Sequence, residues 1–306
     1  MKYEIKETHK NICTDFVQEH HYSPVMPKLT KKWLGVYREG VLVGVITLGW
    51  GTQPLQTINK MFPGLTPADY YEIGKMCMHD DEPKNSETQM LSAVMKWCRD
   101  NTNIRLLYTL ADGIMGKCGY VYQAFNFRYG GSFKTAIYMS DKGEKIHPRT
   151  TRHLCVENGQ FNGEKIGNIS ELTIEFMKHK GINPDALRYF LSDAIDKLLK
   201  ENFDWNHRKV FWLTPDFMKT KGITKYDGLM FRYMLPLTKR DKRLFKTSPM
   251  NWDQPYPKDK DLAWRKMVGP KQYEPCGMPE WDLTQVEYNS KNVNAHKKGA
   301  TLASFL

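Results

Sequence analysis

The chain of 306 residues is 41% hydrophobic and 26% charged, a balance that supports a packed core and argues against wholesale disorder. Its net charge of +11 favours a polyanionic partner, most simply nucleic acid, although a merely basic protein would show the same excess. The sequence has no long apolar run, no apolar leader at its start and no CxxC pair among its six cysteines. We therefore expect a cytoplasmic protein with no membrane-spanning helix, no zinc ribbon and no redox motif.

The first part of the chain alternates between β-rich and helix-forming stretches. Only Glu39-Gly40 separates two β-rich runs, which predicts a tight hairpin. The order predicts an α/β (α+β) fold with a mixed central sheet and helices on both faces, and it resembles the chain order of GNAT-type acyltransferases. The expected elements are a strand at Tyr3–Ile5, a helix from its N-cap Thr8 to Glu19, strands at Trp33–Arg38 and Val41–Leu48, a loop at Gly49–Pro67, a strand at Tyr70–Met78, a helix capped by Asn85 or Ser86 and ending near Arg99, a strand at Arg105–Ala111, a helix at Gly119–Phe125, and one or two strands at Phe127–Met139.

The second part of the chain has a different texture. Helical patterns at Ile169–His179 and Asp185–Glu201 predict a helical insertion that could act as a DNA clamp, a lid or a dimer element. β character returns at Leu229–Leu237, and the remainder is basic and rich in proline and aromatic residues, with little periodicity. The expected organisation is a GNAT-like catalytic core at 1–140, the helical insertion at 141–228, and a closing strand with a basic aromatic tail at 229–306.

A dense cluster of cations opens this tail. Cations can neutralise phosphates, and aromatic faces can stack on exposed bases, so the tail is predicted to bind DNA. A solvated charged face with no ligand is the alternative. The cations are Lys239, Arg240, Lys242, Arg243 and Lys246, and the aromatic residues among and after them are Phe245, Trp252, Tyr256, Trp264 and Tyr273.

Three short segments carry side chains suited to chemistry. His21 and Tyr22 stand where the first helix should end, either as a metal ligand or general base beside a phenol, or simply as a complement to the helix dipole. Asp112 follows an apolar strand, a position where α/β sheets place catalytic groups, although an Asp-Gly turn explains it equally well. Tyr122 is a candidate proton donor, or else a core tyrosine.

A possible cofactor site lies around the second helix. Lys75 could meet a phosphate or carboxylate, and Asn85 and Ser86 open a helix whose free amides could receive an anion. The glycine-rich loop expected for a pyrophosphate is missing there. Binding of acetyl-CoA is therefore not supported by the sequence.

Four segments together resemble the Mom family of phage DNA-modification proteins. They are HHYSP, GVYREGVLVGVITLGWG, YEIGKMCMHDDEPKNSETQML and YTLADGIMGKCGYVYQAFNFRYGG, and the resemblance covers roughly residues 15–135 and resumes at 231–258. It implies a GNAT-like fold and the addition of a methylcarbamoyl group to the exocyclic amine of adenine in phage DNA. Such a modification hides the DNA from host restriction enzymes, and the enzyme would act in the host cytoplasm.

The resemblance also implies roles for individual residues. His21 and Tyr22 align with the family's His-Tyr pair, Asp112 with its catalytic aspartate and Tyr122 with its catalytic tyrosine. The family has been proposed to use iron, which makes His21 a candidate Fe²⁺ ligand, with Tyr22 or Asp112 as further ligands. Lys75 stands where the family usually has arginine, so a point charge replaces a bidentate fork.

Three hypotheses follow for the function. In the first, a DNA base-modifying transferase flips a base out of the duplex and stacks it on Trp50, Phe127 or the tail aromatics. Asp112 then accepts the proton or orients the amine, while Tyr122 stabilises the developing charge. The second is a GNAT-type acyltransferase acting on a small molecule or protein. The third is a non-catalytic DNA-binding module; the oligomeric state, including a homodimer, is left open.

Overall fold

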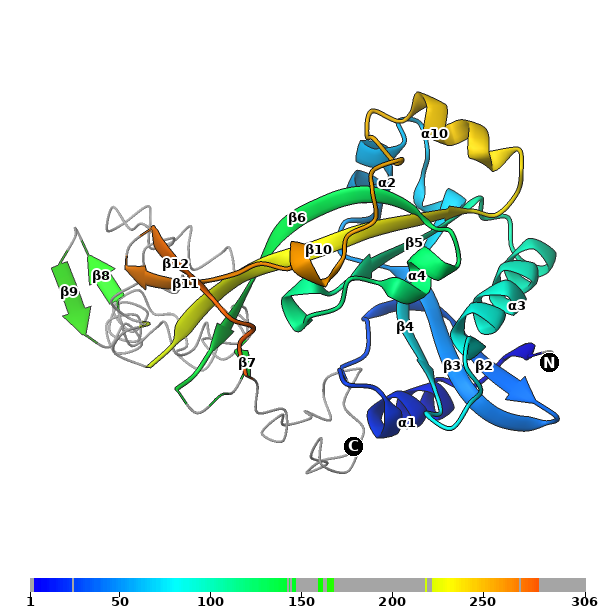
Figure 1. Cartoon of the computed structure of the whole chain (residues 1–306), viewed down its shortest axis with the longest axis horizontal. Coiled ribbons are helices and arrows are strands. Elements are labelled where there is room, and N and C mark those ends of the chain that lie inside the picture. Colours follow the sequence, from blue (N-terminus) through cyan, green and yellow to red (C-terminus); the bar gives the residue numbers. More distant parts are fainter. Residues whose placement is uncertain are drawn as a thin grey trace, which may run out of the picture.

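The structure is a computed structural model that describes residues 3–23, 25–141, 143, 145–146, 159–161, 164–167, 218, 222–269 and 271–280. Its main helices and strands are shown in Figure 1. In chain order they are β1 (Glu4–Glu7), α1 (Lys10–His20), β2 (Leu29–Arg38), β3 (Val41–Trp50), α2 (Pro54–Met61), β4 (Tyr70–Met78), α3 (Ser86–Asn101), β5 (Leu106–Ala111), α4 (Tyr120–Ala124), β6 (Arg128–Met139), β7 (Lys145–Ile146), β8 (Gly159–Phe161), β9 (Glu164–Gly167), β10 (Thr224–Pro236), α10 (Leu244–Thr247), β11 (Trp264–Gly269) and β12 (Gln272–Cys276).

One large mixed sheet organises these elements. Its strand order is β1-β2-β3-β4-β5-β10-β11-β12, with β6 paired to β10 and β7 paired to β6. The pairing of β4 with β5 is parallel, and the other pairs described in this sheet are antiparallel. The long strands β6 and β10 run together across the molecule and lead toward β11 and β12 (Figure 1). A separate pair, β8 with β9, lies within the predicted insertion.

Helices cover both faces of the sheet. Val45 and Ile46 are neighbours on β3, so their side chains point to opposite faces. Val45 packs with Phe16 of α1, whereas Ile46 belongs to the cluster that contains Val94 of α3. Ile58 of α2 packs with Leu106 of β5, whereas the next residue, Leu107, belongs to the α3 cluster. The helix α2 therefore lies on the face of the sheet opposite α3. The predicted fold class, a mixed sheet with helices on both faces, is confirmed.

The predicted hairpin is also confirmed, and its turn explains the choice of residues. Glu39 and Gly40 both have positive φ, at 53° and 83°. Two successive residues with positive φ are typical of the two-residue turns whose twist matches that of paired strands. The turn fixes the register of β2 on β3, with Arg38 opposite Val41.

The neighbouring strands β4 and β5 separate after a short parallel stretch. Their pairing covers three residue pairs and ends where Glu72 faces Tyr108. Immediately afterwards Thr47 of β3 faces Lys75 while Leu48 faces Ile73, so Gly74 is an extra residue on β4. Such a β-bulge bends its strand, and here it coincides with the point where β4 leaves β5.

Several local predictions were wrong. The first helix begins after His9, whose ring accepts a hydrogen bond from the Asn11 amide, and Thr8 is not its cap. The expected loop at 49–67 contains α2, which starts at Pro54, a residue whose fixed φ suits the first helical position. Asn85 is the N-cap residue of α3, one of the two predicted, but it has a left-handed conformation and makes no side-chain capping bond.

The second part of the chain differs from expectation at both ends of the closing strand. β10 begins at Thr224, ahead of the predicted start at Leu229, and pairs with both β5 and β6. The tail that follows adds β11 and β12 to the sheet, although its sequence showed little periodicity. The two helices predicted at 169–179 and 185–201 lie outside the described residues.

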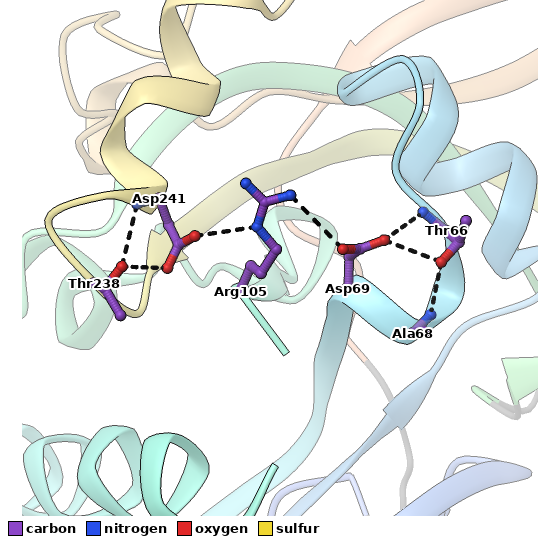
Figure 2. A network of polar contacts seen from close by, with 6 residues as sticks. All are labelled: Thr66, Ala68, Asp69, Arg105, Thr238 and Asp241. Carbon is purple, nitrogen blue, oxygen red and sulfur yellow. Dashed lines mark hydrogen bonds and ion pairs between the residues drawn. The ribbon is translucent and has the colours of Figure 1, made fainter. Parts of the chain in front are cut away.

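The basic segment at the start of the tail, residues 239–246, contains one acidic residue, Asp241, and this residue anchors the segment to the sheet. Asp241 is buried, accepts a hydrogen bond from Arg105 Nε at 3.1 Å and contacts the Thr238 hydroxyl at 2.5 Å. Arg105 also approaches Asp69, which caps the turn that begins at Thr66. Figure 2 shows this chain of contacts, which fastens the segment to the ends of β5 and β10.

Replacing the anchor should therefore destabilise the fold. We expect Asp241→Asn to lower the free energy of unfolding by about 1–3 kcal/mol, because a buried hydrogen bond to a charged group is weakened. The matched control is Asp253→Asn, whose carboxylate is 78% exposed beside Arg128 and should contribute less than about 1 kcal/mol. Chemical denaturation measures both values, and equal losses would contradict the anchoring role.

Candidate active site

A cavity of about 830 Å³ opens where β4 and β5 part. Its walls come from the end of α1, from β4, from the end of β5 and from the loop that leads into α4. This volume is in the usual range of small-molecule sites. Five side chains predicted from the sequence line it: His21, Tyr22, Lys75, Asp112 and Tyr122.

The other predicted site residues lie elsewhere. Asn85 and Ser86 do not line this cavity; Ser86 is buried and its hydroxyl donates to the Pro83 carbonyl. The cations of the basic segment are exposed and follow β10, whose end pairs Pro236 with Leu106. Asp112 follows the opposite end of β5, where Ala111 pairs with Phe231. The basic segment is therefore separated from Asp112 by about 17 Å of strand.

His21 reaches the cavity because α1 ends there. Its amide donates to the Val17 carbonyl at 2.9 Å, and its extended backbone ends the helix. The ring Nδ1 lies 2.9 Å from the Ser23 amide nitrogen and 3.1 Å from the Ser23 carbonyl oxygen. Burial, and then the nearby Lys75 ammonium, lower the pKa of His21 to about 3. The imidazole is therefore neutral at physiological pH and can accept or donate according to its tautomer.

Two phenols and a carboxylate form the centre of the cavity. Burial raises the pKa of Tyr22, and the negative charge of Asp112 raises it further. Burial also raises the pKa of Tyr122, which makes a side-chain hydrogen bond with Thr109. Both phenols therefore keep their protons at neutral pH and can donate hydrogen bonds. The ring of Tyr22 stacks on that of His21, with centroids 4.4 Å apart.

The turn that carries Asp112 is built by close packing against β10. The Asp112 carbonyl accepts hydrogen bonds from the amides of Met115 and Lys117 at 2.9 and 3.0 Å. A Cβ atom at Gly113 would lie 2.5 Å from the Phe231 ring, so the position needs glycine. The Asp-Gly turn and the cavity-lining carboxylate are thus the same feature, and the two interpretations of the sequence are compatible.

Cations contribute to two walls of the cavity. The Lys75 ammonium donates to the Ser23 carbonyl at 2.6 Å, which ties β4 to the segment after α1. Lys117 is exposed at the rim, and its ammonium lies 5.5 Å from the Tyr22 ring centroid. These charges favour an anionic group on a bound substrate.

The buried side-chain amide of Gln123, the residue after Tyr122, connects α4 to the tail. The Gln123 Nε2 group donates to the Pro257 carbonyl at 2.9 Å and to the Tyr233 hydroxyl at 3.0 Å. Its Oε1 accepts from Lys258 at 3.2 Å. The helix that presents Tyr122 is therefore hydrogen-bonded directly to residues 257–258.

The sequence analysis missed one cavity residue with a strong chemical signature. Glu72 lines the cavity, and its Oε2 accepts a hydrogen bond from the Gly51 amide at 3.1 Å. Burial raises the pKa of Glu72 to about 7. A signal was present, because a glutamate inside the mostly apolar strand Tyr70–Met78, which has Lys75 as its other charged residue, is unusual and calls for a reason.

The side chains expected to bind iron, His21, Tyr22 and Asp112, line this cavity together. Within the part of the chain that the structure describes, no three His, Cys, Asp or Glu side chains gather as a metal-binding group. Iron binding by His21, with Tyr22 or Asp112 as further ligands, stays a prediction.

Two of the aromatic residues proposed to stack on a base are buried in the core. Phe127 and Trp252 are buried, with Trp252 stacked on Phe62. Tyr256 donates to the Phe127 carbonyl at 2.7 Å. Trp50 is half-buried, and its indole nitrogen donates to the carbonyls of residues 67 and 70. Phe127 and Trp252 have no exposed face for a base, so the stacking prediction was wrong for these two.

Comparison with models of known protein families gives a match over most of this chain. A model of the Mom protein family matches residues 2–202 of this chain. The chain belongs to the Mom protein family. The match reaches further into the predicted insertion than the resemblance did, and it ends before β10.

The methylcarbamoylase Mom of Escherichia phage Mu is 34% identical over 153 residues, which cover 45% of this chain and 57% of that protein. The match therefore spans little more than half of that relative's length.

Solved structures with some likeness to this Mom family member are acetyltransferases. The aminoglycoside acetyltransferase AAC(6')-Ib, solved with coenzyme A and kanamycin, is 8% identical, with a TM-score of 0.33 over 43% of this chain and 87% of that one. An N-acetyltransferase from Staphylococcus aureus Mu50 is 16% identical, with a TM-score of 0.29 over 44% and 86%. These scores are too low to support a further conclusion. In the described part of the chain, no helix is long and apolar enough to cross a membrane.

The pKa of Glu72 predicts how stability depends on pH. Because it rises from 4.5 to about 7 on folding, the protonated carboxyl stabilises the folded state fully below 4.5. This contribution is lost as the pH rises through 7. We therefore expect the Tm of Glu72→Gln to increase relative to that of the unaltered protein as the pH rises across this window. Differential scanning calorimetry measures the trend, with Glu87→Gln, at an exposed position, as the control. A pH-independent difference would contradict the raised pKa.

Proposed function

We propose that this protein is a transferase that modifies bases in phage DNA within the host cytoplasm. The modification proposed is addition of a methylcarbamoyl-type group to the exocyclic amine of adenine, which would protect the DNA from host restriction. The observation that carries the proposal is the convergence of His21, Tyr22, Asp112 and Tyr122 on one cavity, although they come from separate parts of the chain. Membership of the Mom family and the similarity to a methylcarbamoylase support it.

The cavity has the groups that such a reaction needs. An exocyclic amine is a weak nucleophile held inside the duplex, so the base must leave the stack before it can react. Asp112 can accept a hydrogen bond from the amine and so orient it. Tyr22 and Tyr122 stay protonated and can donate to the carbonyl oxygen of the donor as negative charge develops there. Lys75 and Lys117 add positive potential at the walls.

Modified DNA is the direct test of this proposal. The full chain is expressed in bacteria, the plasmid is digested to nucleosides, and new masses are sought by chromatography and mass spectrometry. We expect a new adenine nucleoside, and a loss of at least about 100-fold in its yield for Asp112→Asn and Tyr122→Phe. Asp253→Asn, on the surface away from the cavity, should leave the yield unchanged.

The controls separate this proposal from its alternatives. Circular dichroism and Tm must show that the variants are folded. A new nucleoside that persists in folded D112N would remove Asp112 from the mechanism. Unmodified plasmid in every strain, with DNA binding retained, would favour a DNA-binding module, and acetylated small molecules or proteins would favour an acyltransferase.

The basic segment provides a second prediction. We propose that Lys242 and Lys246 contact DNA phosphates. The slope of log affinity against log salt is negative, and the double variant Lys242→Gln/Lys246→Gln should make it shallower by about 1.8, because each lost phosphate contact contributes about 0.9. The matched control is Lys6→Gln/Lys96→Gln, which removes two exposed lysines on β1 and α3. Fluorescence anisotropy with a duplex measures both slopes, and equal slopes would show that the segment does not contact DNA.

A further inference from the structure

We propose that Glu72 is a further catalytic residue of this site and accepts the proton that the base amine loses during transfer. The inference rests on the proposed function and deepens it. It assigns proton transfer from the amine to Glu72 and leaves Asp112 to hold the donor rather than the amine.

The position of Glu72 follows from the separation of the two central strands. It belongs to the last residue pair that joins β4 to β5, opposite Tyr108. The bulge at Gly74 follows at once, so Glu72 lies at the inner end of the cavity that the parting strands enclose. Asp112 lies four residues beyond Tyr108, about 13 Å further along the strand. The two carboxyl groups thus lie at different depths of one cavity and leave room for a substrate between them.

The surroundings of Glu72 hold its carboxyl in place and keep it reactive. The Gly51 amide donates to Oε2, and a Cβ atom at residue 51 would lie 2.8 Å from that oxygen, so glycine permits the approach. The other titratable groups near this carboxyl are the phenols of Tyr70 on β4 and Tyr108 on β5. Arg232 of β10 is hydrogen-bonded to Tyr108.

This environment contains no cation that pairs directly with Glu72 among the described residues, and burial dominates its titration. With a pKa of about 7, the group is present both as carboxylate and as acid near neutral pH. A carboxyl group in this condition can take up a proton and release it again, which is the property required of a general base. The residue is only partly buried, so a substrate in the cavity can reach it.

The step balances with an activated carbonyl donor. The lone pair of the exocyclic nitrogen forms the new N–C bond, and the bond from the carbonyl carbon to the leaving group breaks with its electron pair. One N–H proton passes to the Glu72 carboxylate, which becomes the neutral acid. The proton then leaves for solvent or for the departing group, and the carboxylate is restored. No oxidant or reductant is consumed.

The test measures initial rates of DNA modification against pH. Purified full-length protein acts on plasmid DNA, with the small-molecule fraction of a bacterial extract as the source of donor, and the new nucleoside is quantified by mass spectrometry. We expect the rate of the unaltered protein to fall tenfold per pH unit below about 7, as Glu72 becomes protonated. Glu72→Gln should lose at least about 100-fold in rate and should not show this acidic limb.

Two further variants distinguish catalysis from structure. Glu72→Asp keeps a carboxyl and should retain an acidic limb with part of the rate, whereas E72Q keeps an oxygen that can accept from Gly51 and should fold. D112N should lower the rate of modification, but its residual rate should still fall as the pH drops below about 7. Wild-type rates that are flat across pH 7, or an E72Q rate within about twofold of wild type, would overturn the role of Glu72. If E72Q does not fold, the wild-type profile alone decides. An unaltered protein that modifies no DNA would instead overturn the proposed function.

Discussion

The separation of β4 from β5 is the constraint on which this molecule depends. Parallel pairing stops after Glu72, next to the extra residue Gly74, and β4 stays paired with β3 on both sides of this bulge. The sheet therefore opens without losing its continuity, since β5 is secured on its other side by β10. The opening admits side chains from α1, β4, β5 and α4 to one cavity. The titratable groups that line this cavity share the environment that the separation creates.

The electrostatic character of the cavity follows from partial burial. Partial burial lowers the pKa of His21, raises the pKa values of Tyr22 and Tyr122, and brings the pKa of Glu72 into the neutral range. The cavity therefore offers hydrogen-bond donors and a proton acceptor at the same pH. Groups with such separated ionisation states are what acid–base chemistry requires. The two lysines at its walls make the same cavity attractive to an anionic substrate.

The sequence predicted the regular parts of this structure better than the irregular ones. The strand Tyr70–Met78 was predicted with its observed bounds, because apolar and β-branched residues determine it locally. The helix at 54–61 and the strands β11 and β12 were missed, since proline and charge obscured their short patterns. Five cavity residues were singled out from their places in the chain and were then matched to a family resemblance. Glu72 was not, because its chemistry arises from burial by residues distant in the chain.

The hydrogen bonds of Gln123 give the tail a structural role that its sequence does not indicate. Residues 257–258 are bonded to the helix that presents Tyr122, and β10, which lies between β5 and β6, is likewise outside the region matched by the family model. A fragment ending at residue 202 would thus lack both the strand that pairs with β5 and the hydrogen bonds that hold the helix of Tyr122. The region matched by the family model is therefore not sufficient by itself to support the walls of this cavity. A substitution in the tail would accordingly shift the cavity wall without altering any residue that lines it.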